Sequence, residues 1–295
     1  MASAKFIVRR IKSAKNISQI TRAMQMVAAS KMRQAQEKAI SGKPYSEKIY
    51  EVTRSLALKV DPKTHPLLKR PEGKLYPLIV LITTNKGLCG GLNTNLLRSL
   101  NKFLNERFAE NIQIDFVTLG KKGQSFVLRF GGGYLADFSK MTPFTDAVGP
   151  IVKLITDQFL RGKYNQVWLV YNNFINALKQ NPKIKQILPI ASKELIKEEL
   201  EKEEKIEVKE YLFEPSADEI LNTLIPFYLE IQVREAILEA EASEHSARMI
   251  AMKNATDNAL DLMDGLTLEY NKLRQQLITA EISDITTAKI SMEVE

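Results

Sequence analysis

Side chains that could bind a phosphate or support catalysis occur together in one glycine-rich stretch, TTNKGLCGGLN, at positions 83–93. It follows the apolar run LYPLIVLI and precedes a helix-like segment, and many proteins hold a phosphate at such a strand-to-helix turn. Lys86 would add positive charge there. The stretch lacks both G-x-x-x-x-G-K-[ST] and G-x-G-x-x-G, the spacings of the two common phosphate motifs. We therefore expect a tight turn rather than a nucleotide site, because glycines also let a chain turn sharply and pack closely.

The chain contains few residues that could support other catalysis or bind a metal. Cys89 is the single cysteine, so no internal disulfide can form, and no nearby histidine could activate its thiol. The two histidines, His65 and His245, are far apart in the sequence, which argues against a zinc site. The GGGY run at 131–134 is typical of a turn before a strand. We expect no catalytic residue, no metal site and no cofactor.

Positive charge is concentrated at the start of the chain. The net charge is +7, and residues 1–36 carry eight basic side chains and no acidic one. A helix with this composition suits an acidic partner, which could be nucleic acid, an anionic membrane surface or an acidic protein surface. A solvated basic face is the plainer alternative. Charge alone does not choose among them.

Composition is typical of a soluble protein that stays in the compartment where it is made. With 295 residues, 44% of them hydrophobic, the chain can bury a substantial core. No window reaches the ~18 consecutive apolar residues of a membrane span, and the start lacks the apolar block of a secretory signal. The basic opening superficially suits a mitochondrial transit peptide, but the same helical pattern continues to about Leu58.

The sequence predicts a long N-terminal helix, residues 1–58. Its apolar residues recur at steps of three, four and seven, which describes one stripe along a helix. We expect at most a bend at Gly42-Lys43-Pro44, and a continuous helix would be about 80 Å long at 1.5 Å per residue. The stripe consists of Ile7, Ile11, Ala14, Ile17, Met24, Ala28, Met32, Ala35 and Ala39.

The C-terminal segment, residues 215–295, predicts a second long helix with a coiled-coil seam. Alternate steps of three and four over more than five heptads indicate such a seam. Glu235 interrupts the same register upstream, Ser216 with Glu219 offers a capping box, and Pro226 predicts a kink. The seam positions are Ala242, His245, Met249, Met252, Thr256, Ala259, Met263, Leu266, Tyr270, Leu273, Leu277 and Ala280.

Two apolar stripes at opposite ends of one chain predict an antiparallel coiled coil of the first and last helices. The C-terminal helix is longer, so its end should extend past the start of the other. That end, LITAEISDITTAKISM, carries apolar and small residues around its whole circumference. It should either fray or sit in a sleeve supplied by another protein.

The middle of the chain, residues 75–214 after a linker at 59–74, alternates strand and helix patterns. Near-continuous apolar strands separated by helices predict a mainly parallel sheet covered on both faces, a Rossmann-like α/β domain. The densely charged stretch 191–205 predicts a solvated linker or surface helix. The expected strands are 75–84, 111–120, 164–174, 185–191 and 206–214, and the expected helices are 93–108, 121–130 and 145–161.

Three stretches together resemble one protein family. They are ITRAMQMVAASKMRQAQ at 20–36, the glycine loop at 83–93, and SEHSARMIAMKNATDNALDLMDGLTLEYNKLRQQLITAEISDI at 243–285. In this order, and in a chain of this length, they resemble the γ subunit of the rotary F-type ATP synthase. The family's fold, an antiparallel coiled coil with a Rossmann-like domain at its foot, agrees with the pattern predicted from the residues.

The resemblance implies a mechanical function. The coiled coil would pass through a ring of three α and three β subunits, and the foot would join the ε subunit and the membrane c-ring, with one copy per complex. Proton flow would turn the ring and the shaft, so that each β subunit forms and releases ATP in turn. The chain itself would be a non-catalytic subunit.

The resemblance also assigns contact residues. Contacts with the β subunits fall on the two terminal helices and on the helix after the glycine loop, while the foot contact with the c-ring and ε falls in YLFEP. Residues 280–295 would occupy the apolar sleeve of the αβ ring. The β-contact residues would be Met24, Lys31, Arg33, Arg98, Lys102, Arg274 and Gln275, and the foot residues Tyr211 and Glu214.

The resemblance has limits, and two other functions stay open. The chain lacks the paired cysteines and inserted segment of the chloroplast form, so we expect no thiol switch. The absence of a transit peptide favours a bacterial protein at the cytoplasmic face of the plasma membrane, held there peripherally through the complex. The first alternative is a basic coiled-coil protein that binds nucleic acid with steep salt dependence. The second is a nucleotide hydrolase that uses Lys86.

Overall fold

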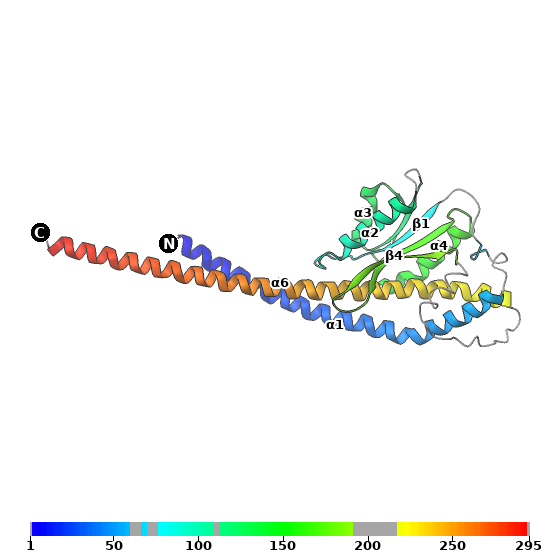
Figure 1. Cartoon of the computed structure of the whole chain (residues 1–295), viewed down its shortest axis with the longest axis horizontal. Coiled ribbons are helices and arrows are strands. Elements are labelled where there is room, and N and C mark those ends of the chain that lie inside the picture. Colours follow the sequence, from blue (N-terminus) through cyan, green and yellow to red (C-terminus); the bar gives the residue numbers. More distant parts are fainter. Residues whose placement is uncertain (1, 60–65, 70–75, 109–111, 191–216, 294–295) are drawn as a thin grey trace. The chain divides into compact units, whose positions relative to one another are not determined.

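The computed structural model describes residues 2–59, 66–69, 76–108, 112–190 and 217–293. Contacts divide the chain into two compact units. Unit 1 consists of residues 1–29 and 248–295, and unit 2 consists of residues 30–247. The segments that form unit 1 come from the two ends of the chain, coloured blue and red in Figure 1.

Two long helices contribute to both units. Helix α1 runs from Ala2 to Lys59 and helix α6 from Ala217 to Glu293. The pair is antiparallel, since in unit 2 Lys38 interacts electrostatically with Glu241 while Tyr50, further along α1, bonds Glu235, which lies earlier in α6. The predicted coiled coil of the terminal helices is confirmed. Ser216, half of the predicted capping box, lies outside the described residues.

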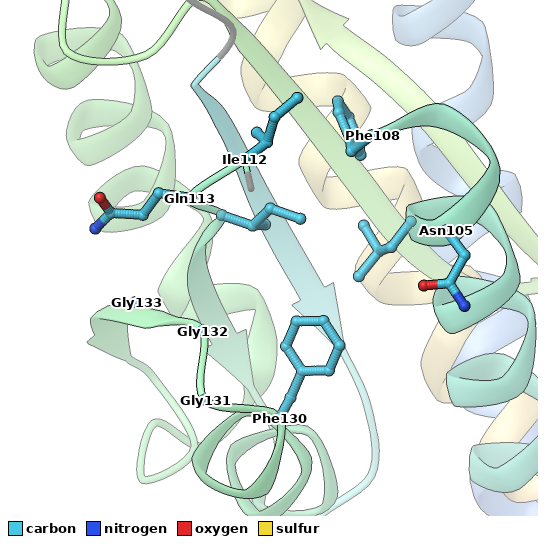
Figure 2. Close-up of a pocket in the computed structure, with 10 residues that line it drawn as sticks. Asn105, Phe108, Ile112, Gln113, Phe130, Gly131, Gly132 and Gly133 are labelled. Atoms are coloured by element: carbon cyan, nitrogen blue, oxygen red, sulfur yellow. The ribbon is translucent and has the colours of Figure 1, made fainter. Parts of the chain in front are cut away.

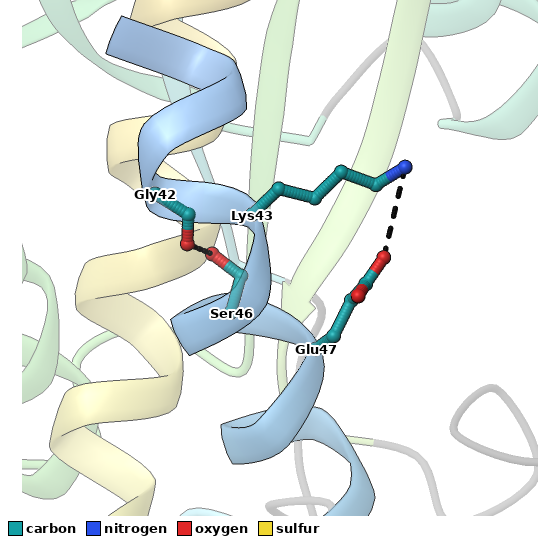
Figure 3. Close-up of polar contacts among 4 residues, drawn as sticks. All are labelled: Gly42, Lys43, Ser46 and Glu47. Atoms are coloured by element: carbon teal, nitrogen blue, oxygen red, sulfur yellow. Dashed lines mark hydrogen bonds and ion pairs between the residues drawn. The ribbon is translucent and has the colours of Figure 1, made fainter.

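Helix α1 continues through Pro44, as the sequence predicts. Proline removes one N–H donor and crowds the preceding turn, which usually kinks or breaks a helix. Here the Ser46 hydroxyl donates to the Gly42 carbonyl at 3.2 Å, and Lys43 pairs with Glu47 at 3.6 Å (Figure 3). The ion pair is exposed and contributes little. The serine bond keeps the Gly42 carbonyl engaged within the turn that contains the proline.

A five-stranded sheet forms the centre of unit 2, in the order β3-β2-β1-β4-β5. Strands β1, β2, β3 and β4 are parallel, and β5 runs antiparallel to β4. The predicted mainly parallel sheet is therefore confirmed. The strands are β1 (Pro77–Ile82), β2 (Asp115–Leu119), β3 (Gly133–Asp137), β4 (Gln166–Phe174) and β5 (Gln180–Leu188).

Helices cover both faces of this sheet. One core joins the sheet to the apolar side of α2 (Leu92–Arg107) and to Val127 of α3 (Lys121–Phe130). The other core joins it to α4 (Val148–Leu160), to the short 3-10 helix η1 (Phe144–Ala147) and to Ile225–Ile237 of α6. Because β1 is buried along its whole length between these layers, it reads as an uninterrupted apolar run.

The α/β pattern of the sequence was accurate, with three qualifications. The predicted strand 185–191 covers only the second part of β5, which begins at Gln180 and ends at Leu188. The predicted helix 145–161 is two elements, η1 and α4. The predicted strand 206–214 and the charged stretch 191–205 lie outside the described residues. The chain turns before β3 at Gly131, as the GGGY run predicts, and the strand begins at Gly133.

Candidate functional site

The glycine loop, residues 83–93, connects the end of β1 to the start of α2 and lies over the first turn of α3. The first N–H groups of a helix are unsatisfied within it and attract anions. In α3 three of them are already occupied by the loop: the N–H of Lys121 donates to Asn85 Oδ1 (3.0 Å), that of Lys122 to the Thr84 carbonyl (3.2 Å), and that of Gly123 to Thr83 Oγ1 (2.8 Å). The loop itself therefore fills the anion site of this helix.

The close approach of this loop requires glycine at the entrance to α3. Gly120 has φ 111°, a conformation that L side chains rarely adopt, and a Cβ there would lie 2.2 Å from the Thr83 carbonyl oxygen. The loop and the helix start are thus in direct backbone contact. No space for a phosphate remains between them.

The side chain of Asn93, in the first turn of α2, bonds back to the glycine loop. The amide of Asn93 turns back, donating to Thr84 Oγ1 (2.8 Å) and to Cys89 Sγ (3.3 Å), while its Oδ1 accepts from the Thr84 N–H (3.3 Å). Cys89 is buried within this network. The prediction of a tight turn rather than a nucleotide cradle agrees with this geometry, and Cys89 is a packed side chain as expected.

One residue of the loop was missed by sequence reasoning. Leu88 has φ 62°, in the left-handed region, and 63% of its side chain is exposed. A left-handed non-glycine residue costs about 1–2 kcal/mol, and such strain concentrates at functional sites. No signal in the sequence distinguishes Leu88 from a buried leucine, because its conformation depends on the internal bonds of the loop.

No group of three or more His, Cys, Asp or Glu side chains with metal-binding spacing occurs in the described residues. Tyr164 donates to Asp115 at 2.5 Å, and burial together with this bond raises the pKa of the tyrosine. The pair joins the start of β2 to the start of β4, which is a structural role. In the described part of the chain, no helix is long and apolar enough to cross a membrane.

A pocket of about 740 Å³ opens at the amino ends of β2 and β3, bordered by the end of α2 and by the run Gly131–Gly133 (Figure 2). In parallel α/β sheets, ligands bind at the opposite edge, beyond the carboxyl ends of the strands. The pocket lining contains apolar side chains, two amides and glycines, and no titratable group. It therefore lacks the groups for acid–base catalysis.

Two half-buried glutamates of α6 in unit 2 have a raised pKa. Burial raises the pKa of Glu239, against the opposing effect of Lys183, and burial likewise raises the pKa of Glu241, against Lys38. Oε2 of Glu239 is buried without a hydrogen-bond partner among the described groups. Glu235, which interrupts the predicted seam, accepts a bond from Tyr50 at 2.6 Å. Polar side chains thus link α6 to α1 and to the sheet.

The seam of unit 1 follows the predicted register on α6. Between residues 257 and 280, the side chains that are not fully exposed occur at alternate steps of three and four and all belong to the predicted seam. At Thr256, the hydroxyl lies 2.6 Å from that of Thr21 on α1. Ala280, the last predicted position, is exposed. The partly covered positions are Ala259, Met263, Leu266, Tyr270, Leu273 and Leu277.

The predicted stripe of α1 contains one error. Ile17 is half exposed, and Ser18 and Thr21 are buried in its place. The steps from Ala14 to Ser18 and Thr21 keep the three-four alternation, so polar residues enter the seam and apolar ones are displaced from it. Ile17, Ile20 and Val27 then form a second apolar stripe, defined by these three residues, on the exposed surface of α1.

The predicted contact residues lie mainly on exposed helix surfaces. Lys31 and Arg33 are exposed on α1, and Arg98 and Lys102 on α2, where Lys102 lies 3.7 Å from Glu106. Met24 is half-buried, and Arg274 and Gln275 are exposed on α6 of unit 1. Beyond Leu277, every side chain with a described exposure is exposed. Tyr211 and Glu214 lie outside the described residues. This arrangement is a set of surfaces rather than a closed site.

Comparison with protein families gives one match over almost the whole chain. The model described as "ATP-synt: ATP synthase" matches residues 3–291. A protein of Chloroflexus aurantiacus named ATP synthase gamma chain is 39% identical over 296 residues, covering 99% of each chain. The protein of the same name from Verminephrobacter eiseniae is 43% identical over 291 residues, covering 97% of each.

Solved structures with a similar fold come from rotary enzymes. A chain from the rotor of the Euglena gracilis mitochondrial ATP synthase has a TM-score of 0.64 at 24% identity and covers 94% of this chain and 99% of its own. A chain from the central stalk and c-ring of the Tetrahymena thermophila mitochondrial ATP synthase has a TM-score of 0.56 at 26% identity, with coverages of 80% and 99%. At 24% identity, the similarity to the Euglena gracilis chain shows the fold alone.

Proposed function

Because the chain belongs to the ATP synthase gamma-chain family, we propose that it is the central rotor shaft of a proton-translocating F-type ATP synthase. It transmits rotation of the membrane c-ring to the catalytic ring of three α and three β subunits. In reverse, ATP hydrolysis turns the shaft. The relatives give no support to the nucleic-acid alternative.

The observation that carries this proposal is the outward surface of unit 1. Ile17, Ile20 and Val27 are exposed on α1, although a two-helix pair could have buried them by turning α1 on its axis. A stripe of exposed apolar residues in a monomer marks a contact surface. The segment that carries this stripe is basic, since residues 1–36 contain eight basic side chains and no acidic one. Such a surface suits a ring with an apolar sleeve and acidic levers on the β subunits.

The paired helices also have the symmetry that the function needs. A ring of three identical β subunits adopts three different states only when the axle inside it lacks threefold symmetry. Two helices of different sequence supply that asymmetry: the buried seam residues of α1 include Ser18 and Thr21, and those of α6 include Met252 and Leu266. The packed seam adds the stiffness that torque requires.

Specific residues take specific roles in this proposal. Met24, Lys31 and Arg33 on α1 contact the β levers, together with Arg98 and Lys102 on α2. Arg274 and Gln275 on α6 contact a β-subunit loop higher in the ring, and residues 280–295 lie in the sleeve. The exposure of all of the named contact residues except the half-buried Met24 supports this, as does the absence of any described covered position after Leu277.

Two further contacts complete the proposal. Leu88, strained and exposed on the glycine loop, is a docking residue for a neighbouring subunit. Tyr211 and Glu214 contact the c-ring and the ε subunit at the foot.

The chain acts without an active site of its own. Its glycine loop is filled by its own side chains, so the nucleotide is held by neighbouring subunits. The protein is a peripheral part of a membrane-associated complex, at the cytoplasmic face of a bacterial plasma membrane. One copy serves each complex.

Co-purification tests the proposal. A tagged chain should bring down α and β subunits in a three-to-three ratio with one copy of itself, and the assembly should hydrolyse ATP. Isolation as a self-sufficient monomer or homodimer would contradict it. ATP turnover by the purified chain alone, lost in Lys86→Ala, would instead support the nucleotide-hydrolase alternative. Binding to DNA that weakens steeply with salt would support the nucleic-acid alternative.

A further inference from the structure

The sheet of unit 2 has two edge strands that differ in their protection. Edge strands present unpaired backbone groups, and proteins usually blunt them with lysine or proline. Strand β5 carries Pro182, Lys183 and Lys185. Strand β3, with the sequence GYLAD, contains neither residue type and pairs with β2 on one side alone within the described chain. One edge is guarded against pairing and the other is not.

Three large apolar side chains are exposed on β3 and on the helix that leads to it. Leu128 and Phe130 at the end of α3 are 68% and 40% exposed, and Tyr134 of β3 is 41% exposed. Contacts hold the two aromatic rings in place: Phe130 stacks on Phe126 with ring centroids 5.6 Å apart, and the Tyr134 hydroxyl accepts a bond from Gln124 at 3.3 Å. Exposed apolar side chains near an open edge are characteristic of a docking surface.

The pocket at the amino ends of β2 and β3 adjoins this edge. Phe130 and the run Gly131–Gly133, which leads into β3, form part of its wall (Figure 2). Leu104, Phe108 and Ile114 line it further in. Its 740 Å³ has room for a bulky apolar side chain, and partners anchor interfaces in such pockets. The pocket and the edge strand thus share Gly133, the first residue of β3.

The rim of the surface is positive. Lys121, Lys122 and Arg129 on α3 and Lys140 after β3 are exposed. The carboxylate of Asp137 at the end of β3 is engaged by the hydroxyls of Thr118 and Ser139. A second copy of this chain would bring like charges together, which disfavours a homodimer across this edge. The charge favours an acidic partner.

We propose that the outer edge of β3 receives a β-strand of an acidic partner protein, which extends the sheet and seats one bulky apolar side chain in the pocket beside Gly131–Gly133. Backbone hydrogen bonds along β3 supply affinity, and the pocket and the basic rim supply specificity. The site is distinct from the helix surfaces assigned to the β subunits. Its test uses the assembled enzyme, so the proposal rests on the proposed function in that respect.

Hydrogen–deuterium exchange tests this proposal on the isolated chain and on the purified assembled enzyme. Amides of residues 133–137 should exchange at least tenfold more slowly in the assembly. Tyr134→Lys and Leu128→Lys should restore the rate of the isolated chain, and Arg129→Glu should give an intermediate rate. Leu178→Lys, at an exposed leucine between β4 and β5, is the matched control and should change nothing.

Two results would overturn the proposal. One is equal exchange of residues 133–137 in the isolated chain and in an assembly whose subunits are all present. The other is slower exchange confined to α3, which would mean contact without strand pairing. Co-purification of α and β subunits is checked first, so failure of assembly is separated from failure of strand addition. Fluorescence of Trp168, the single tryptophan, confirms that each variant is folded.

Discussion

The two units use their apolar residues in opposite ways. In unit 2 the largest side chains are enclosed, and Phe116, Ile155 and Tyr164 are fully buried between the sheet and its helices. In unit 1 the α1 seam is formed by small and polar side chains such as Ala14, Ser18 and Thr21, while larger apolar residues of the same helix face outward. Unit 2 is stabilised from within. Unit 1 depends on what surrounds it.

This difference follows from geometry. A sheet covered on both faces buries two layers of side chains, whereas a pair of helices buries one stripe on each. Outward apolar residues of α6 in unit 1 include Leu260, Leu262 and Leu268. A lone helix pair gains nothing from these side chains until a partner covers them. The surface that makes unit 1 weak in isolation is the surface that a surrounding ring would grip.

The largest effect is expected from proline at the centre of the unit 1 seam. Leu266→Pro removes a helix hydrogen bond and clashes with the preceding turn, at about 3 kcal/mol or more. Circular dichroism should show loss of helix, and the assembled enzyme should lose coupling between proton flow and ATP synthesis. Leu266→Met, which keeps the helix and nearly the same side-chain volume at the same seam position, is the control and should retain coupling. Intact coupling in Leu266→Pro would contradict the shaft.

Replacement of leucine by alanine should lower the free energy of unfolding by different amounts in the two units. Leu100→Ala opens a cavity at a fully buried position of α2 and should destabilise unit 2 by about 2–5 kcal/mol. Leu266→Ala removes a side chain from a thin seam that can close around the loss, and should cost about 1 kcal/mol, near the lower end of single-residue effects. Urea unfolding followed by Trp168 fluorescence reports unit 2, and helical circular dichroism reports both units. Equal costs would mean that the seam is packed as rigidly as the core.

The sequence predicted those features that depend on local periodicity. The near-continuous apolar run at 77–82 identified a buried parallel strand, and the three-four steps from Ala259 to Leu277 identified the seam. These patterns predict structure correctly because the buried positions of a helix or strand are mostly occupied by apolar residues. The absence of a phosphate motif likewise predicted the closed loop at 83–93.

Features that depend on tertiary contacts could not be predicted in this way. Ile17 was placed in the seam because it is apolar, whereas Ser18 occupies that position and a buried Thr21–Thr256 bond stabilises the polar layer. The exposure of Leu88 follows from bonds between the loop and α3, which lie 36 or more residues apart in sequence. The unguarded edge of β3 appears only when the strand order is known. The contact residues of the family remain predictions until they are measured in an assembly.

A smaller effect is expected from replacing Leu88, because this change should raise the stability of unit 2 while lowering its function. Leu88→Gly removes the cost of a left-handed leucine and should stabilise unit 2, by up to about 1–2 kcal/mol less the added flexibility of glycine in the unfolded chain. If Leu88 docks on a neighbouring subunit, coupled ATP synthesis should fall while the urea midpoint rises. Leu178→Gly, at an exposed leucine outside the loop, is the control. A variant that is both more stable and fully active would show that Leu88 has no docking role.

The smallest effect should come from pH and should be confined to unit 2. Burial raises the pKa of Glu239 on α6 above that of an unfolded glutamate, although Lys183 and Lys185 of β5 and a hydrogen bond with Tyr171 of β4 oppose the shift, while Glu235 adds to it. The folded state therefore binds the proton more tightly than the unfolded state. The stabilisation that Glu239 contributes is complete below the unfolded pKa, near 4.5, and is lost as pH rises through the folded pKa.

Glu239→Gln should remove this part of the dependence of stability on pH. The urea midpoint of the variant, followed by Trp168 fluorescence, should therefore exceed that of the parent at pH 8, and the difference should narrow toward pH 5. Glu269→Gln, exposed on α6 in unit 1, should leave the Trp168 curve unchanged. A parent and a Glu239→Gln variant with parallel pH curves would show that this carboxyl is ionised in both states, and that the polar link between α6 and the sheet carries no proton.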